Sequence, residues 1–322
     1  MYVTQNELII IVEMIDILNL DFDSIKKIYK ENFNELQITF NKGQGVFLND
    51  IYKRYGNDLD CAVIILHYAK NLHRQILRKR EADLNYDISF ESFWKNHSLI
   101  QQKKFKIIEI SKSTGLPKET ARRKIDKLLK IRMLKKNKNI LFWEPTPHDK
   151  NSYDLIINKH MDILINLINS ISKFLDFKLN QDLIKKKILK NFSFYWLHYL
   201  NTQLEYLRIW QSKFNDLELL MIFTEFEIQK HIINQNHNIS NIRVGSVSDV
   251  TGLPRATTFR KISKLSKMKI INKDLLSDKF NKSTNNFLFK NINNYVNMKN
   301  ITNESIENFS NFYTIILRAL YS

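Results

Sequence analysis

Two stretches of the chain repeat the same order of basic, polar and apolar residues, and their basic side chains could bind a polyanion. Residues 114–128 read TGLPKETARRKIDKL, and residues 251–265 read TGLPRATTFRKISKL. In the longer alignment of residues 114–134 with residues 251–271, 11 of 21 positions are identical. Lysine and arginine bind phosphate oxygens, and arginine can also donate two hydrogen bonds to a guanine. The repeat therefore predicts two surfaces with the same binding chemistry in one chain.

The residues around the first stretch predict two short helices joined by a tight turn. Ile107 and Ile110 are spaced for the inner face of a helix over Lys106–Ser113. Gly115 can adopt the left-handed backbone that ends a helix, and Pro117 suits the first turn of the helix that follows. The second stretch repeats these elements, with a helix over 244–250, Gly252 in the turn and Pro254 at the next helix start.

The spacing within each second helix predicts which side chains are buried. Positions i, i+4 and i+7 share one helix face. The inward residues are expected to be Ala121, Ile125 and Leu128 in the first copy, and Thr258, Ile262 and Leu265 in the second. The opposite face of the first copy is expected to carry Glu119, Arg123, Asp126 and Lys130. On that face Glu119 lies one helical turn before Arg123, so its carboxylate could also restrain this arginine.

Short strands are expected beside these helices, with basic residues at the hairpin tips. In the first copy Leu134–Lys135 would pair with Ile140–Trp143, and in the second Ile270–Lys273 would pair with Asn286–Lys290. Ile242–Val244 forms one further strand candidate. Helix, turn, basic helix and basic hairpin together make the pattern of a winged helix-turn-helix.

The segment Gly-Leu-Pro-x-x-Thr-x-x-Arg-Lys-Ile-x-Lys-Leu resembles the recognition-helix segment of MarR-type winged-helix regulators. The resemblance covers positions 104–144 in the first half and 241–291 in the second. In that family a glycine often precedes the first wing strand, whereas Arg132 and Lys269 occupy the place in this chain. The resemblance implies DNA binding by the second helix and by the wing of each copy.

The residues predicted to contact DNA come from the exposed faces of the two helices and from the hairpin tips. In the first copy they are Lys118, Glu119, Thr120, Arg122, Arg123, Lys127, Lys136 and Lys138. In the second copy they are Arg255, Ala256, Thr257, Phe259, Arg260, Lys264, Lys279 and Lys282. The two faces differ around the shared arginines Arg123 and Arg260, so the two half-sites are expected to differ in sequence.

A second similarity extends the repeat toward the N-terminus. Asp58-Leu59-Asp60 leads into an apolar run, and Asp216-Leu217-Glu218 leads into another, and these acidic residues suit helix starts. The offset from Asp58 to Asp216 is 158, whereas the offset from Thr114 to Thr251 is 137. The sequence therefore predicts an internal duplication, with an additional segment in the first copy, about 21 positions long, between Leu77 and Gln102.

Apolar stripes and a proline-broken stretch describe the rest of the chain. Three stripes at helical spacing are Leu164–Leu175, Trp196–Leu207 and Ile306–Leu320. Pro145 and Pro147 mark a boundary, which divides the chain into domains 1–150 and 151–322. The expected fold class is mostly α with small β-hairpin wings, as two winged helix-turn-helix modules joined to helical segments.

Composition restricts the partners and the compartment. The formal charge of +17 favours a polyanionic partner, here double-stranded DNA, and the helical segments could also form a homodimer. Cys61 is the single cysteine, which excludes an internal disulfide and fits a reducing cytoplasm. No signal peptide and no window of about 20 apolar residues is evident, so no membrane partner is expected.

The residue pattern predicts no catalytic site, no metal site and no cofactor. The eight histidines do not cluster, and Gly43-Gln44-Gly45 lacks the further glycines of a phosphate-binding loop. The expected function is sequence-specific DNA binding by a transcription regulator whose effector is unknown. A replication initiator and a winged-helix protein-interaction module remain alternatives, and an enzyme is the least expected class.

Overall fold

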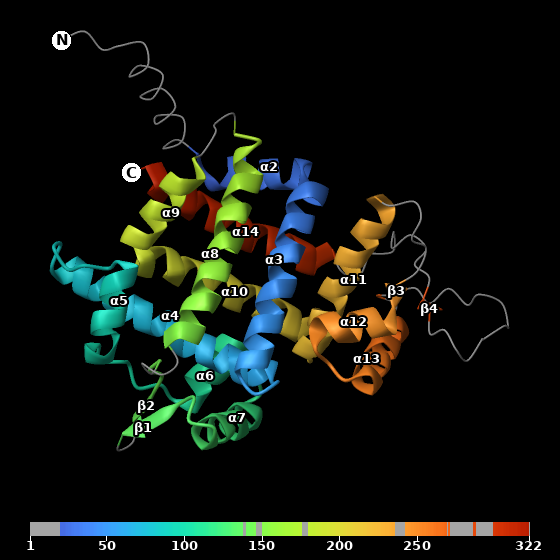
Figure 1. The fold of residues 1–322 in the computed structure, drawn as a ribbon, viewed down its shortest axis with the longest axis horizontal. Helices are drawn as coiled ribbons and strands as arrows, with labels where there is room; N and C mark the ends of the chain where they lie inside the picture. The colour runs from blue at the N-terminus through green and yellow to red at the C-terminus, as the bar shows by residue number, and fades with distance from the viewer. Residues whose placement is uncertain are drawn as a thin grey trace, which may run out of the picture.

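The structure is a computed structural model, and it describes residues 20–137, 140–145, 150–175, 180–235, 242–268, 270, 286–287 and 299–321. It is mostly helical, with two small antiparallel strand pairs (Figure 1). This confirms the expected mostly α fold class with short strands. None of the described helices is long and apolar enough to cross a membrane.

The helices of the first half begin with α2 (Phe22–Glu31), α3 (Phe33–Arg54) and α4 (Leu59–Ala82). The short α5 (Phe90–Asn96) and a 3-10 turn (His97–Leu99) follow, and then come α6 (Ile107–Thr114) and α7 (Lys118–Lys130). The second half contains α8 (Lys150–Ser172), α9 (Gln181–Lys190), α10 (Phe192–Phe214), α11 (Leu217–Gln235), α12 (Val244–Thr251), α13 (Arg255–Lys267) and α14 (Lys299–Tyr321). α5 and the 3-10 turn lie between Leu77 and Gln102, where the sequence predicts an additional segment in the first copy.

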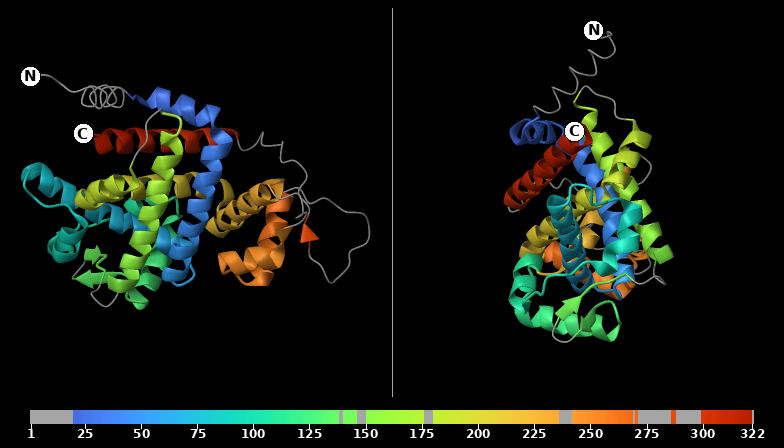
Figure 2. Two further views of the ribbon diagram at one scale, coloured as in Figure 1. Left: turned by 45° about the horizontal axis from the view of Figure 1, so that its top comes forward. Right: turned by 90° about the vertical axis from the view of Figure 1, so that its left-hand side faces the viewer.

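Helices from the two halves interleave in one hydrophobic core. α3 packs against α8 and α11, and α10 packs against α14 and α4. α2 and α14, from opposite ends of the chain, run side by side (Figure 2). Phe309 of α14 links the halves, since its ring centroid lies 4.1 Å from that of Phe40 in α3 and 5.6 Å from that of Tyr206 in α10. The sequence boundary at residue 150 coincides with the start of α8, and the core continues across it.

The three apolar stripes of the second half are buried, as their spacing predicts. The stripe residues include Leu164 and Ile168 of α8, Leu204 of α10, and Ile316 of α14, and all four are almost inaccessible to solvent. α8, α10 and α14 are long helices of equal length, and each presents several turns of apolar surface to the core. Periodicity alone therefore identified these helices and their buried faces.

α6 and α7, which we call the first helix pair, are joined by the tight turn that the sequence predicts. Gly115 ends α6 with φ +74°, a left-handed conformation that glycine adopts without steric cost. Pro117 is the N-cap of α7, one residue before the predicted first-turn position, and its carbonyl accepts the N–H of Ala121 at 2.9 Å. Arg132, after α7, also has a left-handed backbone at φ +59°. The sequence resemblance places a glycine here, and the structure explains why that residue type would suit the site.

The second helix pair, α12 and α13, has the same turn geometry and the same side-chain hydrogen bonds in its turn. Gly252 has φ +70°, and Pro254 caps α13. Ser111 donates to the Leu116 carbonyl at 2.6 Å, and Ser248 donates to the Leu253 carbonyl at 2.6 Å. Thr114 and Thr251 each donate to the carbonyl four residues earlier, at 2.7 Å and 2.6 Å. The same residues at the same spacing thus make the same turn twice.

The inward faces of α7 and α13 agree with the predicted phase. Ala121, Ile125 and Leu128 are buried, and so are Thr258, Ile262 and Leu265. Ile110 is buried and Ile107 is half-buried, as expected for α6. The opposite face of α7, with Glu119, Arg123, Asp126 and Lys130, is exposed.

The strands differ in part from the prediction. β1 (Lys135–Asn137) pairs with β2 (Ile140–Phe142), with Lys135 opposite Phe142, so this hairpin forms about where expected. β3 (Ile242–Arg243) pairs with β4 (Asn286–Phe287), and Val244 already belongs to α12. The expected partner of the 286–290 strand, Ile270–Lys273, lies outside the described residues except for Ile270.

Candidate nucleic-acid interface

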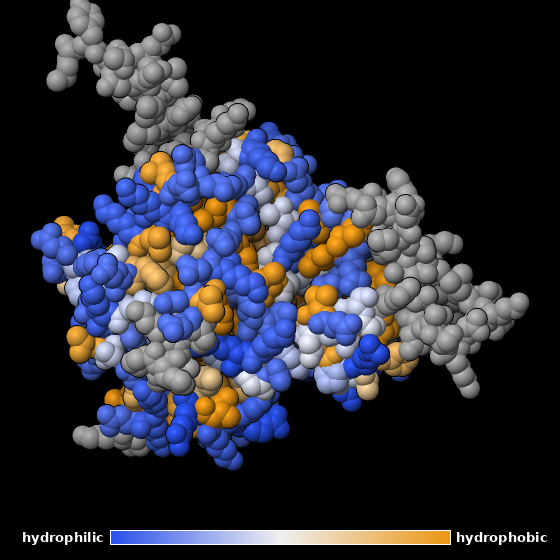
Figure 3. Space-filling model, in the orientation of Figure 1, coloured by the Kyte–Doolittle hydropathy of each residue, from blue (hydrophilic) through white to orange (hydrophobic). Residues whose placement is uncertain are grey.

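The outer face of α7 exposes most of the residues predicted to contact DNA. Lys118, Glu119, Arg122 and Arg123 are exposed, and Thr120 is half-buried. The Arg122 guanidinium lies 3.3 Å from the Glu119 carboxylate. The Glu119 carboxylate thus contacts Arg122, whereas the helical spacing had also allowed it to restrain Arg123. Figure 3 shows hydrophilic residues interspersed with hydrophobic patches at this end of the molecule.

The outer face of α13 is also exposed, with a different chemistry. Arg255, Ala256, Arg260 and Lys264 are exposed, and Thr257 is half-buried. Phe259 is 38% exposed, which is unusual for a large apolar side chain on a helix that has a buried face elsewhere. The second face therefore offers an aromatic ring where the first offers the Glu119–Arg122 pair.

Arg123 and Arg260 occupy matching positions on the two faces. Both are exposed, and neither guanidinium has an ion-pair partner among the described residues. An exposed guanidinium without such a partner can bind a phosphate or the edge of a guanine without first breaking another contact. Arg123 and Arg260 are therefore chemically suited to bind such groups, one on each helix pair.

The hairpin tips are only partly described. Lys136 lies on β1 and is exposed, as predicted. Lys138, Lys279 and Lys282 lie outside the described residues. The hairpin residue Lys135 is bound at 2.9 Å by Glu144, so its charge is balanced within the fold.

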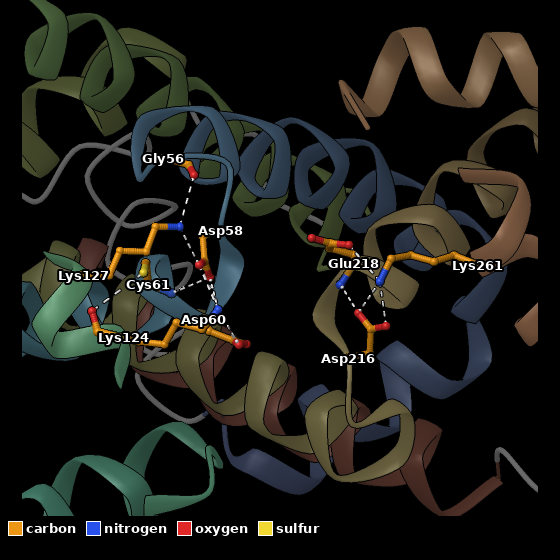
Figure 4. A network of polar contacts seen from close by, with 9 residues as sticks. All are labelled: Gly56, Asp58, Asp60, Cys61, Lys124, Lys127, Asp216, Glu218 and Lys261. Atoms are coloured by element: carbon orange, nitrogen blue, oxygen red, sulfur yellow. Dashed lines mark hydrogen bonds and ion pairs between the residues drawn. The ribbon is translucent and has the colours of Figure 1, made fainter. Parts of the chain in front are cut away.

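A lysine–carboxylate cluster attaches α7 to the start of α4 (Figure 4). The Lys124 ammonium lies 2.8 Å from an Asp58 carboxylate oxygen and 3.1 Å from Asp60. The Lys127 ammonium lies 2.8 Å from the other Asp58 oxygen. Lys127 was predicted to contact DNA, but it must release Asp58 before its ammonium can bind a phosphate. The cluster gives Lys127 a structural role that the sequence did not reveal.

A second cluster attaches α13 to the start of α11 in the same way. Lys261 lies 2.7 Å from Asp216 and 2.8 Å from Glu218 (Figure 4). Lys124 and Lys261 lie 137 positions apart, the offset of the Thr-Gly-Leu-Pro repeat. The acidic residues that they bind, Asp58 and Asp216, lie 158 positions apart, the offset of the second similarity. In each half, the lysine of the repeated helix therefore contacts the acidic residues of the second similarity.

Asp58 also caps α4, which confirms the helix-start role predicted for it. Its side chain accepts the backbone N–H of Cys61 at 3.2 Å. Burial would raise the pKa of the Asp58 carboxyl, but Lys124 and Lys127 outweigh it and hold that pKa below its usual value. Burial raises the pKa of the neighbouring Cys61 thiol to about 12, so this cysteine stays protonated and unreactive near neutral pH.

The Asp58 cluster predicts a specific acid sensitivity. A depressed carboxyl pKa stabilises the fold above the unfolded-state pKa of about 4, and this contribution is lost as the pH falls through the folded-state pKa. We expect the melting temperature of Asp58→Asn to lie below that of the unmodified protein at pH 7. We expect the difference to shrink as the pH falls from about 5 to 3. Thermal denaturation across this range is the measurement.

Asp126→Asn is the matched control for that experiment, because Asp126 is an exposed carboxylate on α7 with no ion-pair partner in the described parts of the chain. It should leave the difference in melting temperature near zero at every pH. A constant deficit of Asp58→Asn from pH 7 to pH 3 would contradict the assignment of the depressed pKa to Asp58.

Each turn packs against the long helix of the opposite half. Gly115 lies beside α10, where a Cβ in its place would meet the Arg208 and Gln211 side chains at 3.5 and 3.6 Å. Gly252 lies beside α3, where a Cβ would meet the Lys53 side chain at 3.3 Å. Asn49 of α3 donates to the carbonyl of Val250 at 2.9 Å. α3 and α10 therefore support the helix pairs reciprocally, each holding the pair that belongs to the other half of the sequence.

A cavity of about 370 Å³ lies between the two clusters. Its walls carry Asp58, Asp60 and Lys124 from one cluster and Asp216, Glu218 and Lys261 from the other. Thr120 and Arg123 of α7 and Gln211 of α10 complete much of the lining. The cavity therefore joins the two halves at the level of α7 and α13.

Among the described residues, no group of three or more histidine, cysteine or acidic side chains is arranged so that it could hold a metal ion. Comparison with protein-family models, with curated proteins and with solved structures finds no match to this chain.

Proposed function

We propose that this protein is a sequence-specific regulator that binds double-stranded DNA through two winged helix-turn-helix modules in one chain. The observation that carries the proposal is the pair of exposed helices α7 and α13. The outer face of each presents an arginine, Arg123 or Arg260, that has no ion-pair partner among the described residues, and a lysine–carboxylate cluster holds each helix from behind. A recognition helix must be exposed and rigidly oriented to read a major groove, and this arrangement provides both properties.

We further propose that the chain arose by internal duplication, so that one chain does the work of a dimer. Support comes from matched helix lengths: α2 and α9 have 10 residues each, α6 and α12 have 8, α7 and α13 have 13, and α8 and α14 have 23. The repeated turn bonds and the two clusters add to this support. Dimeric helix-turn-helix proteins read half-sites about one helical turn apart, and here both readers belong to one chain.

The net charge of +17 supports a polyanionic partner, and the sequence resemblance to MarR-type regulators supports a duplex. The differing faces of α7 and α13 favour an asymmetric site. Glutamate can accept a hydrogen bond from cytosine, whereas alanine and phenylalanine suit a thymine methyl group. We therefore expect an imperfect palindrome bound by one chain.

Selection of bound duplexes from a random DNA pool tests the proposal directly. The expected result is one enriched site with two unlike half-sites separated by about one helical turn. The double substitution Glu119→Ala with Arg122→Phe gives the first face the character of the second, and it should shift the first half-site toward the second. Recovery of no enriched sequence would reject sequence-specific binding.

Salt dependence separates DNA binding from a protein-interaction role. Removing a phosphate-binding cation such as Lys118 or Arg255 should lower the slope of log affinity against log salt by about one. Lys185 on α9 is an exposed lysine outside both helix pairs, so Lys185→Ala is the matched control. If the chain binds no duplex at low salt, the winged modules serve another partner. Mapping the selected site to a promoter or to repeated origin sequences would distinguish a transcription regulator from a replication initiator.

A further inference from the structure

The turns of the two helix pairs contact different residue types at matching positions. Lys53 of α3 and Gln211 of α10 lie 158 positions apart, which is the offset of the second sequence similarity. A Cβ on Gly252, in the α12–α13 turn, would meet Cε of Lys53 at 3.3 Å. A Cβ on Gly115, in the α6–α7 turn, would meet Cγ of Gln211 at 3.6 Å. The two turns thus have the same neighbour position, occupied by a lysine in one case and a glutamine in the other.

At the α6–α7 turn, the two side chains of α10 that lie against the glycine add no uncompensated charge. Gln211 is neutral and only 5% exposed. Arg208 also lies beside Gly115, but its guanidinium donates two hydrogen bonds to the Glu205 carboxylate, one of them at 2.9 Å. The positive charge of Arg208 is therefore balanced within α10.

At the α12–α13 turn, Lys53 supplies an exposed cation. It is exposed to solvent, and its ammonium has no ion-pair partner in the described parts of the chain. The ammonium is one bond beyond Cε, so it lies close to the turn. Asn49, one helical turn earlier on α3, donates to the Val250 carbonyl at 2.9 Å and fixes α3 against α12 (Figure 1). The fold therefore holds the stem of Lys53 at the turn while its charge remains available.

The position of this turn relative to bound DNA follows from the proposed function. In a helix-turn-helix, the first residues of the second helix contact base edges and the first helix crosses the DNA backbone. α13 begins at Arg255, three residues after Gly252. The α12–α13 turn is therefore expected at the edge of the groove, where the phosphates lie. A lysine ammonium is a compact point charge that binds phosphate oxygens.

We propose that Lys53 binds a DNA phosphate in the half-site read by α13, although it belongs to the other half of the sequence. The inference rests on the proposed function and adds a contact that the recognition helices and hairpins do not supply. The half-site read by α7 has no counterpart of this contact, because Gln211 occupies the matching position. The two half-sites then differ in electrostatic attraction as well as in the bases that are read.

Lys53→Gln gives the α12–α13 turn the residue type of the α6–α7 turn, and it is tested in the full chain with the selected duplex. Loss of one phosphate contact should lower the slope of log affinity against log salt by about one. It should also weaken binding about five- to tenfold at about 0.1 M salt. Lys53→Met keeps an unbranched stem against Gly252 and should show the same loss with an unchanged melting temperature. Lys53→Arg keeps the charge and should retain most of the slope.

Lys42→Gln is the matched control. Lys42 is an exposed lysine of α3 that lies 11 residues before Lys53, about three helical turns and 16 Å away on the same helix face. Its replacement should leave the slope unchanged. An unchanged slope in both Lys53→Gln and Lys53→Met overturns the proposal, and so does an equal loss in Lys42→Gln.

A duplex with single neutral phosphates locates the contact. Each phosphate of the selected site is replaced in turn by a methylphosphonate, and the affinities of the unmodified chain and of Lys53→Gln are compared. One replacement should weaken the unmodified chain and have no further effect on Lys53→Gln, because the contact is already lost. That phosphate should lie in the half-site whose sequence preference the Glu119→Ala with Arg122→Phe substitution leaves unchanged. A position in the other half-site contradicts the assignment to α13.

The same titrations keep the two proposals separate. If the unmodified chain binds no duplex, the DNA-binding proposal fails and the inference on Lys53 fails with it. If the unmodified chain binds the selected duplex and Lys53→Gln binds it with equal affinity and slope, only the inference on Lys53 fails.

Discussion

Replacing Arg123 and Arg260 together by alanine is expected to weaken binding of the selected duplex by about 30-fold to 10⁴-fold. A bidentate contact between arginine and guanine contributes about 1–3 kcal/mol of discrimination, and each 1.4 kcal/mol changes affinity about tenfold. The two arginines lie at matching positions on exposed helices, and neither has an ion-pair partner within the described chain. Electrophoretic or fluorescence titration at fixed salt measures the effect.

Two comparisons isolate the role of the guanidinium groups. Arg123→Lys with Arg260→Lys keeps both charges and loses the planar fork, so it should restore non-specific affinity but little of the specificity. Arg78→Ala with Lys185→Ala removes two exposed charges outside the helix pairs and should have a much smaller effect. A double alanine variant that binds within twofold of the unmodified protein would show that neither arginine reads the site.

Truncating either buried isoleucine of the two helix pairs is expected to destabilise the protein by about 2–5 kcal/mol. Ile125 and Ile262 are 4% and 0% exposed, and truncating a buried isoleucine to alanine removes apolar contacts and leaves a cavity. Total stability is typically about 5–15 kcal/mol, so each change removes a large share of it. Chemical denaturation of Ile125→Ala and Ile262→Ala gives the free energy of unfolding.

Ile131→Ala is the control for this measurement, because Ile131 follows α7 and is 41% exposed. Its loss should cost well under half of the effect at Ile125. Equal denaturation midpoints for Ile125→Ala, Ile262→Ala and the unmodified chain would show that the inward faces of α7 and α13 do not contribute to the core.

Local sequence patterns were sufficient to predict the helix pairs. The glycines at positions 115 and 252 predict a left-handed backbone at the same positions. The spacing of Ala121, Ile125 and Leu128 predicts the buried face of the helix that contains them. Arg132 is a further example, because the position where the resembled family often has a glycine, just after α7, has a left-handed backbone in this chain. Such features depend on short-range sterics, which the sequence displays directly.

Long-range packing could not be predicted in this way. Periodicity shows that α10 has a buried face, but it does not show that this face meets α4 and α14. The pairing of β3 with β4 joins strands that are far apart in the sequence. The clusters of Lys124 and Lys261 were also missed, although the two separate repeat offsets carried a signal. In both copies a lysine of the repeated helix recurs together with an acidic pair at a helix start, and this joint recurrence could have suggested that the two groups are in contact.

The reciprocal support of the helix pairs by α3 and α10 affects the order in which a growing chain can fold. As the ribosome extends the chain, α6 and α7 emerge first, but the turn at Gly115 packs against Arg208 and Gln211, which are synthesised much later. The first pair must therefore wait, partly unsupported, until α10 has left the exit tunnel. The second pair meets α3 already made. With about 90 residues still to add at a typical rate of about 5–20 residues per second, the first pair remains incomplete for roughly 5 to 20 seconds. During that window nascent-chain chaperones and proteases have access to the surface of α6 and of its turn that α10 later covers.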